Sequence, residues 1–178
     1  MTQILLSSRT DEWYTPQWLI DKCNKVLGPI DLDPASSELA NETIQARKIF
    51  TRERGGLSND WPDIPSTVFL NPPGGRPSLT KPFWDKLIEY RNSGLLVHAI
   101  FIGFSLEQLQ TTQLGCTDSI ADYPICIPKR RVKYVSPTGE FNSPTHGTVI
   151  AYVPGLQNST SRFVLEFSEV GRCMFPYP

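Results

Sequence analysis

The sequence predicts an α/β protein with a mainly parallel central sheet, helices on both faces of the sheet, and an antiparallel C-terminal edge. Up to about residue 110, helical apolar patterns alternate with short apolar runs. From residue 125 onward, strand-like runs follow one another with only turns rich in Pro, Gly and Ser between them. Alternating helices and strands are typical of parallel sheets, whereas consecutive strands favour antiparallel pairing, so one sheet is expected to contain both.

The first predicted helix covers residues 16–27, where apolar side chains repeat at helical spacing. Thr15 is expected to cap its N-terminus, with Pro16 as the first helical residue and Gly28 as the stop signal. The sequence then predicts a short strand at 30–33 and a modest helix at 35–48. A second short strand at 48–51 and a loop at 55–60 follow.

A buried strand is predicted over residues 67–70, which are β-branched and apolar and lead directly into an Asn-Pro-Pro corner. Pro82 is expected to open the next helix, whose buried stripe comprises Phe83, Trp84, Leu87 and Ile88. A continuous apolar strand over 95–102 follows, and Ser105 begins a pattern typical of a helix capping box.

The C-terminal part predicts strands at 131–136, 148–153 and 162–167, with no helix between them. These strands are expected to form the antiparallel edge, which continues over 156–178. The length of 178 residues fits one domain, 1–178, and leaves no room for a separate target-recognition domain.

Composition excludes several protein classes. Hydrophobic residues make up 39% of the chain and charged residues 20%, which argues against a disordered or fibrous protein. The formal net charge is −1 with a pI near 6.1, so the chain does not bind nucleic acid by bulk positive charge. Any contact with nucleic acid therefore requires a local basic patch.

The positions of potential metal ligands and of apolar residues argue against a metalloprotein and against a membrane or secreted protein. The four cysteines form no CxxC pair, and no cluster of Asp, Glu, His and Cys has metal-ligand spacing, so no metal is expected. No apolar run approaches the ~18 residues that a membrane span requires, and the N-terminus lacks a signal-peptide pattern. These patterns predict a soluble cytoplasmic protein with reduced thiols.

Two predicted strand ends carry unusual residues, and ligands of open α/β sheets bind where strands end. Asn71, Pro72 and Pro73 form a rigid corner in which the prolines have no N–H, so one amide side chain stands beside free acceptor carbonyls. Such a corner can hold an amino group through the Asn71 side-chain oxygen and the Pro72 carbonyl. The alternative is a plain proline-rich turn.

The second strand end places Asp33 before Pro34, Ala35 and Ser36 at the start of a helical pattern. A carboxylate there can balance a cationic cofactor or bind a hydroxyl group. The alternative is an Asp that caps a helix beginning with proline, which is a common arrangement.

Together these segments resemble the phage and prophage DNA N6-adenine methyltransferases of the Dam type. The resemblance covers residues 11–155 and consists of motifs in the family's order: Glu12-Trp13-Tyr14-Thr15-Pro16, Asp31-Leu32-Asp33-Pro34-Ala35-Ser36, Asn71-Pro72-Pro73, and a basic C-terminal stretch that begins at Cys126. It implies a Rossmann-like methyltransferase fold in a cytoplasmic, phage- or prophage-encoded enzyme, with S-adenosylmethionine as methyl donor and a flipped-out adenine in DNA as acceptor.

The resemblance also implies roles for individual residues. Asn71, Pro72 and Pro73 would form the catalytic corner that holds the adenine N6. Residues of three segments would bind the cofactor. They are Trp13, Thr15 and Pro16 near the N-terminus, Asp33, Pro34, Ala35 and Ser36 after the first strand, and the acidic-aromatic pair Asp60 and Trp61. The family's catalytic motif usually continues with an aromatic residue that stacks on the base, but this chain has Gly74 there.

Gly74 leaves several interpretations open. Phe83 or Trp84 can supply the ring instead, although both also fit the core of their helix. A different or modified base can be the acceptor, or the chain can be a non-catalytic DNA-binding protein that keeps the fold.

DNA contact is expected from a basic stretch within five residues, Lys129, Arg130, Arg131 and Lys133, with Arg76 and Lys81 near the same cleft. The alternatives are a solvated charge run on an edge strand and a docking site for a protein partner. A monomer is favoured.

Overall fold

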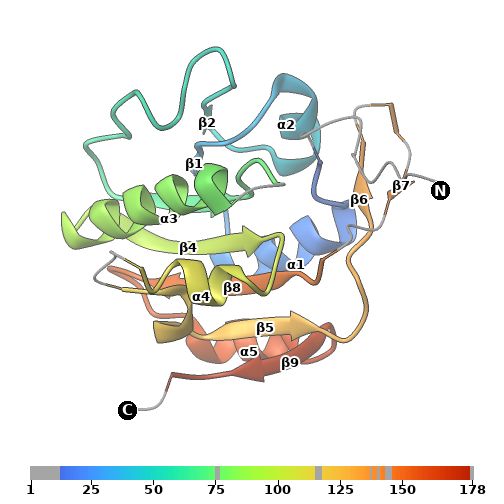
Figure 1. Cartoon of the computed structure of the whole chain (residues 1–178). Coiled ribbons are helices and arrows are strands. Elements are labelled where there is room, and N and C mark those ends of the chain that lie inside the picture. The colour runs from blue at the N-terminus through green and yellow to red at the C-terminus, as the bar shows by residue number, and fades with distance from the viewer. Residues whose placement is uncertain are drawn as a thin grey trace.

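The computed structural model describes residues 13–74, 77–114, 118–136, 138–139, 141–142 and 146–176. Its main sheet contains seven strands in the order β2 (Lys48–Ile49), β1 (Leu32–Asp33), β3 (Ser66–Leu70), β4 (Leu96–Gly103), β8 (Val149–Pro154), β5 (Ile125–Pro128) and β9 (Gly171–Met174) (Figure 1). The first four strands are parallel, and each following pair is antiparallel. The predicted parallel sheet with an antiparallel edge is confirmed.

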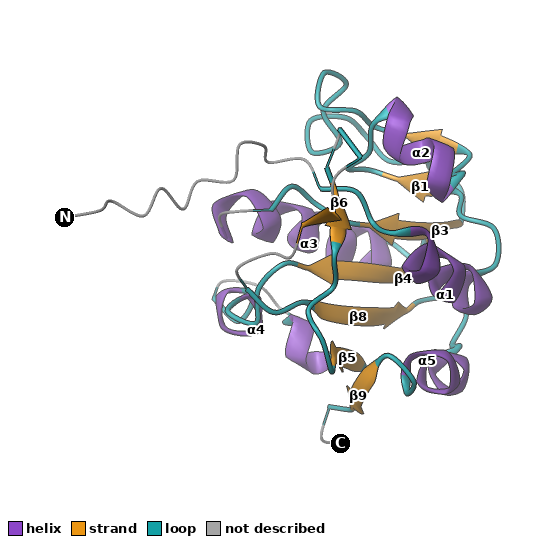
Figure 2. Cartoon of the chain, turned by 90° about the vertical axis from the view of Figure 1, so that its right-hand side faces the viewer, coloured by secondary structure: helices purple, strands orange, loops and turns teal. Residues whose placement is uncertain are grey.

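Helices cover both faces of this sheet (Figure 2). The core on one face includes side chains of α1 (Gln17–Leu27), α2 (Glu38–Ile44) and α5 (Thr160–Phe167). The core on the other face includes side chains of α3 (Pro77–Asn92) and η1 (Ile120–Asp122), and α4 (Gln108–Thr111) packs against it. A separate hairpin of β6 (Tyr134–Val135) and β7 (Phe141–Asn142) completes the fold. The prediction that residues 131–136 form a strand of the antiparallel edge is therefore wrong, because only 134–135 are extended and they pair with β7 outside the main sheet. In the described part of the chain, none of the helices has the length and apolar character needed to cross a membrane.

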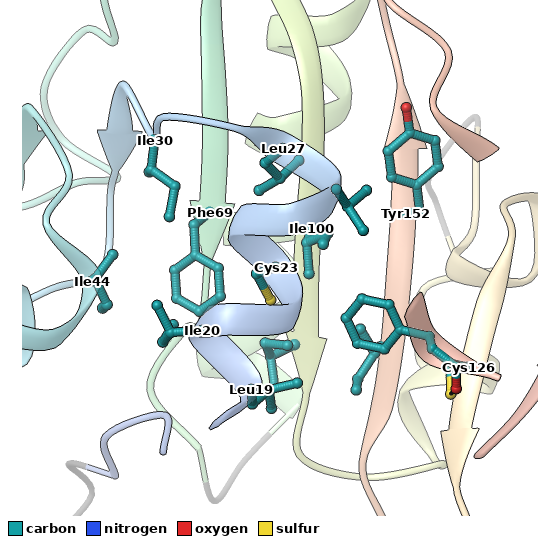
Figure 3. Close-up of a cluster of buried hydrophobic side chains, with 14 of the residues drawn as sticks. Leu19, Ile20, Cys23, Leu27, Ile30, Ile44, Phe69, Ile100, Cys126 and Tyr152 are labelled. Atoms are coloured by element: carbon teal, nitrogen blue, oxygen red, sulfur yellow. Dashed lines mark hydrogen bonds between the residues drawn. The ribbon is translucent and has the colours of Figure 1, made fainter. Parts of the chain in front are cut away.

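The predicted apolar stripe of the first helix forms the centre of one core. Leu19, Ile20 and Cys23 are completely buried on α1, and they lie over Phe69 of β3 and Ile100 of β4 (Figure 3). Because these apolar groups leave water together, the stripe fixes α1 against the parallel half of the sheet.

The start of α1 differs by one residue from the prediction. Pro16 occupies the N-cap position, and its carbonyl accepts hydrogen bonds from the backbone N–H groups of Leu19 and Ile20. The Thr15 hydroxyl, which was expected to cap the helix, instead accepts a hydrogen bond from the Asn71 side chain. The prediction was wrong because a tertiary partner takes the hydroxyl that a local cap would use.

The predicted strand at 162–167 is wrong, because this segment forms the helix α5. Within the described residues 156–176, β9 is the strand that joins the antiparallel edge. Phe163, Leu165 and Phe167 alternate as in a strand, but the two phenylalanines also share one face of a helix. Both are fully buried with their ring centroids 4.7 Å apart, whereas Leu165 is 65% exposed. The helix prevails because α1 offers the phenylalanine face an apolar surface.

Two helix boundaries and one predicted cap also differ from the prediction. The helix α3 begins at Pro77, so Pro82 lies inside it rather than at its start. The helix α2 is shorter than the predicted 35–48, since Gln45 adopts a left-handed conformation with φ of 57° and ends it. Ser105 accepts a hydrogen bond from the Glu107 N–H but forms no capping box; the capping box belongs to η1.

Removing the N-cap of α2 is expected to destabilise the protein. The Ser37 hydroxyl accepts a hydrogen bond from the Ala40 N–H at 3.1 Å. The substitution Ser37→Ala removes this acceptor and should lower the free energy of unfolding by about 1 kcal/mol, measured by urea denaturation without cofactor. The control Ser37→Asp keeps a capping oxygen and should retain most of the stability. Equal losses in both variants would contradict the capping role.

Candidate active site

A cavity of about 330 Å³ lies at the carboxyl ends of β1 and β3. The strand order reverses here, because the chain leaves β1 toward β2 on one side and continues with β3 on the other. Ligands of open α/β sheets bind at this kind of switch point. The wall includes both unusual strand ends predicted from the sequence: Trp13, Thr15, Asp33, Pro34, Ala35, Ser36, Asn71, Pro72 and Pro73 all line the cavity.

Asn71 is the first residue after β3, and its amide group is held in one orientation. Its Nδ2 donates hydrogen bonds to the Trp13 carbonyl oxygen at 3.1 Å and to Thr15 Oγ1 at 3.0 Å. A backbone carbonyl only accepts, so the nitrogen of the amide must face it. The other amide atom, Oδ1, is buried and has no hydrogen-bond partner among the described residues. The cavity wall therefore carries a buried acceptor whose orientation is fixed.

The two prolines after Asn71 stiffen this corner. Pro72 is buried and Pro73 is exposed, and neither has an N–H that could bond to nearby acceptors. The Thr80 hydroxyl of α3 donates to the Pro73 carbonyl at 3.3 Å. The corner is thus connected to the helix that follows it.

Asp33 ends β1 and contributes a buried carboxyl group to the cavity. It is 1% exposed, and Oδ1 accepts a hydrogen bond from the Ala35 N–H at 3.1 Å. Burial raises the pKa of Asp33 to about 7, and hydrogen bonds from Ala35 and Ser36 only partly oppose this shift. Near neutral pH this group therefore changes its charge readily, and a cation or hydroxyl in the cavity would favour its ionised form.

The segment 51–58 closes the cavity beside the Asp33 corner. Gly56 approaches this corner so closely that a Cβ atom there would lie 1.8 Å from the Pro34 carbonyl oxygen. The Trp61 indole N–H donates to the Gly56 carbonyl at 2.8 Å from behind this segment. Only glycine permits this contact, and Trp61 holds it in place.

The N-terminal segment is also tied to the basic stretch. Tyr14 and Val135 of β6 exchange two backbone hydrogen bonds of 2.8 and 3.0 Å. Because β5 runs parallel to β4, its carboxyl end lies at the same edge of the sheet as the cavity. Figure 1 shows the chain running along this edge from β5 to β6. The predicted DNA-contacting residues on this segment are all exposed: Lys129, Arg130, Arg131 and Lys133.

The remaining predicted site residues do not line the cavity. Pro16 is buried at the start of α1, Asp60 is exposed, and Trp61 packs edge-on against Tyr90 with ring centroids 5.3 Å apart. Lys81 of α3 forms an ion pair with Asp85 at 2.5 Å. Arg76 lies outside the described residues.

Of the two aromatic residues proposed to replace the ring missing at Gly74, only one reaches the cavity. Phe83 lines it, whereas Trp84 is fully buried, donates to the Asp118 carbonyl, and packs against Phe101 and Tyr123. Trp84 is therefore a core residue.

Sequence reasoning missed several residues of the wall. They include Tyr14, Phe50, Leu79, Phe104 and the segment 51–58. The adjacent glycines 55 and 56 were a signal for this segment, since paired glycines after a short strand favour a close backbone approach. Nothing in the local pattern around Phe104 distinguished it from a core residue.

A search for metal sites and comparisons with known proteins bear on this site. In the described part of the chain, no group of three or more His, Cys, Asp or Glu side chains is placed to hold a metal ion. A family model described as DNA N-6-adenine-methyltransferase (Dam) matches residues 3–107, more than half of the 178 residues. The match contains every described residue of the cavity wall and ends before the basic stretch. No curated protein and no solved structure matches the chain.

Proposed function

The chain belongs to the DNA N-6-adenine-methyltransferase (Dam) family, and we propose that it methylates N6 of a flipped-out adenine with S-adenosylmethionine as methyl donor. The observation that carries this proposal is the unpartnered, buried Oδ1 of Asn71 in the wall of the cavity. Buried acceptors without a partner are rare in folded proteins, and one in a cavity wall suits a ligand that brings a donor.

The adenine amino group is a donor of this kind. Its nitrogen lone pair is delocalised into the ring, so the free amino group is a weak nucleophile. We propose that one amino hydrogen bonds to Asn71 Oδ1 and the other to the Pro72 carbonyl, which favours a pyramidal nitrogen with a localised lone pair. Thr15 and Trp13 hold the Asn71 amide in the required orientation. Most of the rate enhancement then comes from positioning and from a dry, preorganised site.

The residues near Asp33 fit the methyl donor. S-adenosylmethionine, when bound, supplies a methyl group on a positively charged sulfur that keeps the bonding electron pair as the methyl departs. The Asp33 carboxylate can balance positive charge or accept from a hydroxyl, and Pro34, Ala35 and Ser36 form the rest of the corner. The adenine N6 forms the new bond, and its surplus proton passes to water.

Other predicted cofactor residues act from the edges of the cavity in this proposal. Trp13 and Thr15 line the cavity and would hold the methionine end of the cofactor, and Pro16 is buried next to them in the chain. Trp61 and the neighbouring Asp60 act through the segment 51–58, since the Trp61 indole holds the Gly56 carbonyl.

DNA binding is proposed to use the exposed basic stretch beside the cavity. The triple variant Arg130→Ala, Arg131→Ala, Lys133→Ala should weaken DNA binding, since phosphate contacts release counterions. The slope of log affinity against log salt concentration should become shallower by about 1 for each lost contact, measured by fluorescence anisotropy. The control Arg162→Ala lies on α5 and is exposed, so it should leave the slope unchanged. An unchanged slope in the triple variant would favour a solvated surface or a protein-binding role.

The proposed reaction is tested by nucleoside mass spectrometry. Unmethylated DNA of broad sequence content is incubated with the protein and S-adenosylmethionine, then digested to nucleosides. A new N6-methyladenine signal is the expected result. A methyl group on another base would refute adenine as the acceptor. No methylation, with cofactor binding confirmed by calorimetry, would favour a non-catalytic DNA-binding protein.

A further inference from the structure

The glycine after the Asn-Pro-Pro corner faces an aromatic ring from another strand. Gly74 is buried, and a Cβ atom built on it would lie 3.0, 3.1 and 3.2 Å from the Cδ2, Cγ and Cε2 atoms of Phe104. The backbone of Gly74 is outside the left-handed region, so its conformation alone does not require glycine. The Phe104 ring therefore occupies the space that a side chain at position 74 would need.

Phe104 is held firmly at this place. It is the first residue after β4, the neighbour of β3, so it reaches the cavity from the next strand end along the sheet. It lines the same cavity as Asn71 and is 8% exposed. Its ring packs against that of Tyr134, with centroids 4.9 Å apart and planes inclined by 37°. Tyr134 is fully buried and its hydroxyl pairs with Thr148.

The other phenylalanines of the cavity have different positions. Phe50 belongs to the cofactor corner, because its backbone N–H donates to the Asp33 carbonyl at 3.0 Å and its carbonyl accepts from the Ser36 N–H at 2.9 Å. Phe83 extends from α3 and belongs to the core on the opposite face of the sheet from Phe104. Phe104 is the phenylalanine of the wall that packs on the residue ending the Asn-Pro-Pro-Gly run.

We propose that Phe104 stacks on the target adenine and thereby supplies from β4 the ring that Gly74 does not carry. The inference rests on the proposed function. A base that leaves the DNA helix loses its stacking partners, and enzymes that act on such bases hold them against aromatic or apolar side chains. Stacking on Phe104 would place the base next to Asn71 Oδ1, and Gly74 is small because the ring already fills its side-chain space.

Moving the ring between the two positions tests this proposal. Phe104→Leu keeps apolar volume but removes the ring, so kcat/KM for DNA should fall about 10- to 100-fold, the effect typical of losing one base-stacking ring. Gly74→Phe alone should also impair the enzyme, because its Cβ meets Phe104. The double variant Phe104→Ala, Gly74→Phe removes that clash and restores a ring from the other side. It should recover most of the activity lost in Phe104→Ala.

Three readouts make the test specific. Thermal unfolding and the Kd for S-adenosylmethionine should stay close to those of the parent protein in the Phe104→Leu and double variants. The control Phe167→Leu removes a buried ring of α5 that packs against Phe163 and does not line the cavity. It should leave kcat/KM for DNA within about threefold, well below the loss typical of a stacking ring. A folded, cofactor-binding Phe104→Leu with undiminished kcat/KM would overturn the proposal, as would a folded double variant that recovers nothing. A parent protein that methylates no DNA would instead refute the proposed function itself.

Discussion

Replacing Asn71 with alanine is expected to lower the turnover of DNA methylation about 10²- to 10³-fold, the effect typical of removing one preorganised hydrogen-bonding group from a transition state. The Asn71 amide meets the conditions for such a role, since both Nδ2 hydrogens are engaged by the segment 13–15 and Oδ1 is left as a buried acceptor. Affinity for DNA and for S-adenosylmethionine should change little, because the substitution leaves intact the basic stretch and the Asp33 corner, which we propose to bind phosphates and the cofactor. Single-turnover kinetics with saturating DNA measures the chemical step.

A milder variant separates the acceptor from its support. Thr15→Val removes one of the two acceptors that orient the Asn71 amide but leaves the Trp13 carbonyl in place. Turnover should therefore fall about fivefold, in keeping with the loss of one neutral hydrogen bond. A folded Asn71→Ala protein with turnover within threefold of the parent would show that the acceptor is not used. If neither the parent nor the variant turns over but both bind DNA, the chain is a non-catalytic DNA-binding protein.

The sequence predicted the two strand ends of the cavity because their chemistry is local. Asn71 follows the apolar run 67–70 directly, and Asp33 ends the short alternating run 30–33. Each precedes a proline, so strand, corner and polar group can be recognised together. The parallel arrangement of the strands then brings the two ends together without further information.

The parts that escaped prediction depend on contacts between segments distant in the chain. The place of Phe104 over Gly74 and the closeness of Gly56 to Pro34 arise only when β4 and the segment 51–58 pack against the two corners. The strand predicted at 162–167 became α5 for a similar reason, since its apolar pattern fits both periods and only the surface of α1 selects the helix. Local propensity is a weak guide where tertiary burial decides.

Replacing Asp33 with asparagine is expected to stabilise the cofactor-free protein at pH 8 while weakening cofactor binding at least tenfold. The pKa of Asp33 is higher in the folded protein, about 7, than its ordinary value of 3.8. The folded chain therefore holds a proton that the unfolded chain has already released, and the contribution of Asp33 to stability falls as the pH rises from about 4 to about 7. Asparagine stays neutral, so Asp33→Asn should gain on the order of a few kcal/mol at pH 8 and nothing at pH 4.

Cofactor affinity should rise with pH, whereas the contribution of Asp33 to stability falls. A positively charged sulfur or a ribose hydroxyl interacts best with the ionised carboxylate, so the affinity of the parent protein for S-adenosylmethionine should rise between pH 6 and pH 8. The Asp33→Asn variant should show no such rise, measured by calorimetry across this range. S-adenosylhomocysteine, which lacks the sulfur charge, separates the two roles of the carboxylate. If its affinity rises less between pH 6 and pH 8 than that of S-adenosylmethionine, the carboxylate pairs with the sulfur charge. If the two affinities rise equally, the carboxylate binds a hydroxyl group. If Asp33→Asn binds S-adenosylmethionine at pH 8 as tightly as the parent protein, the buried carboxylate has no part in holding the methyl donor. Its destabilising effect would then serve no role in cofactor binding.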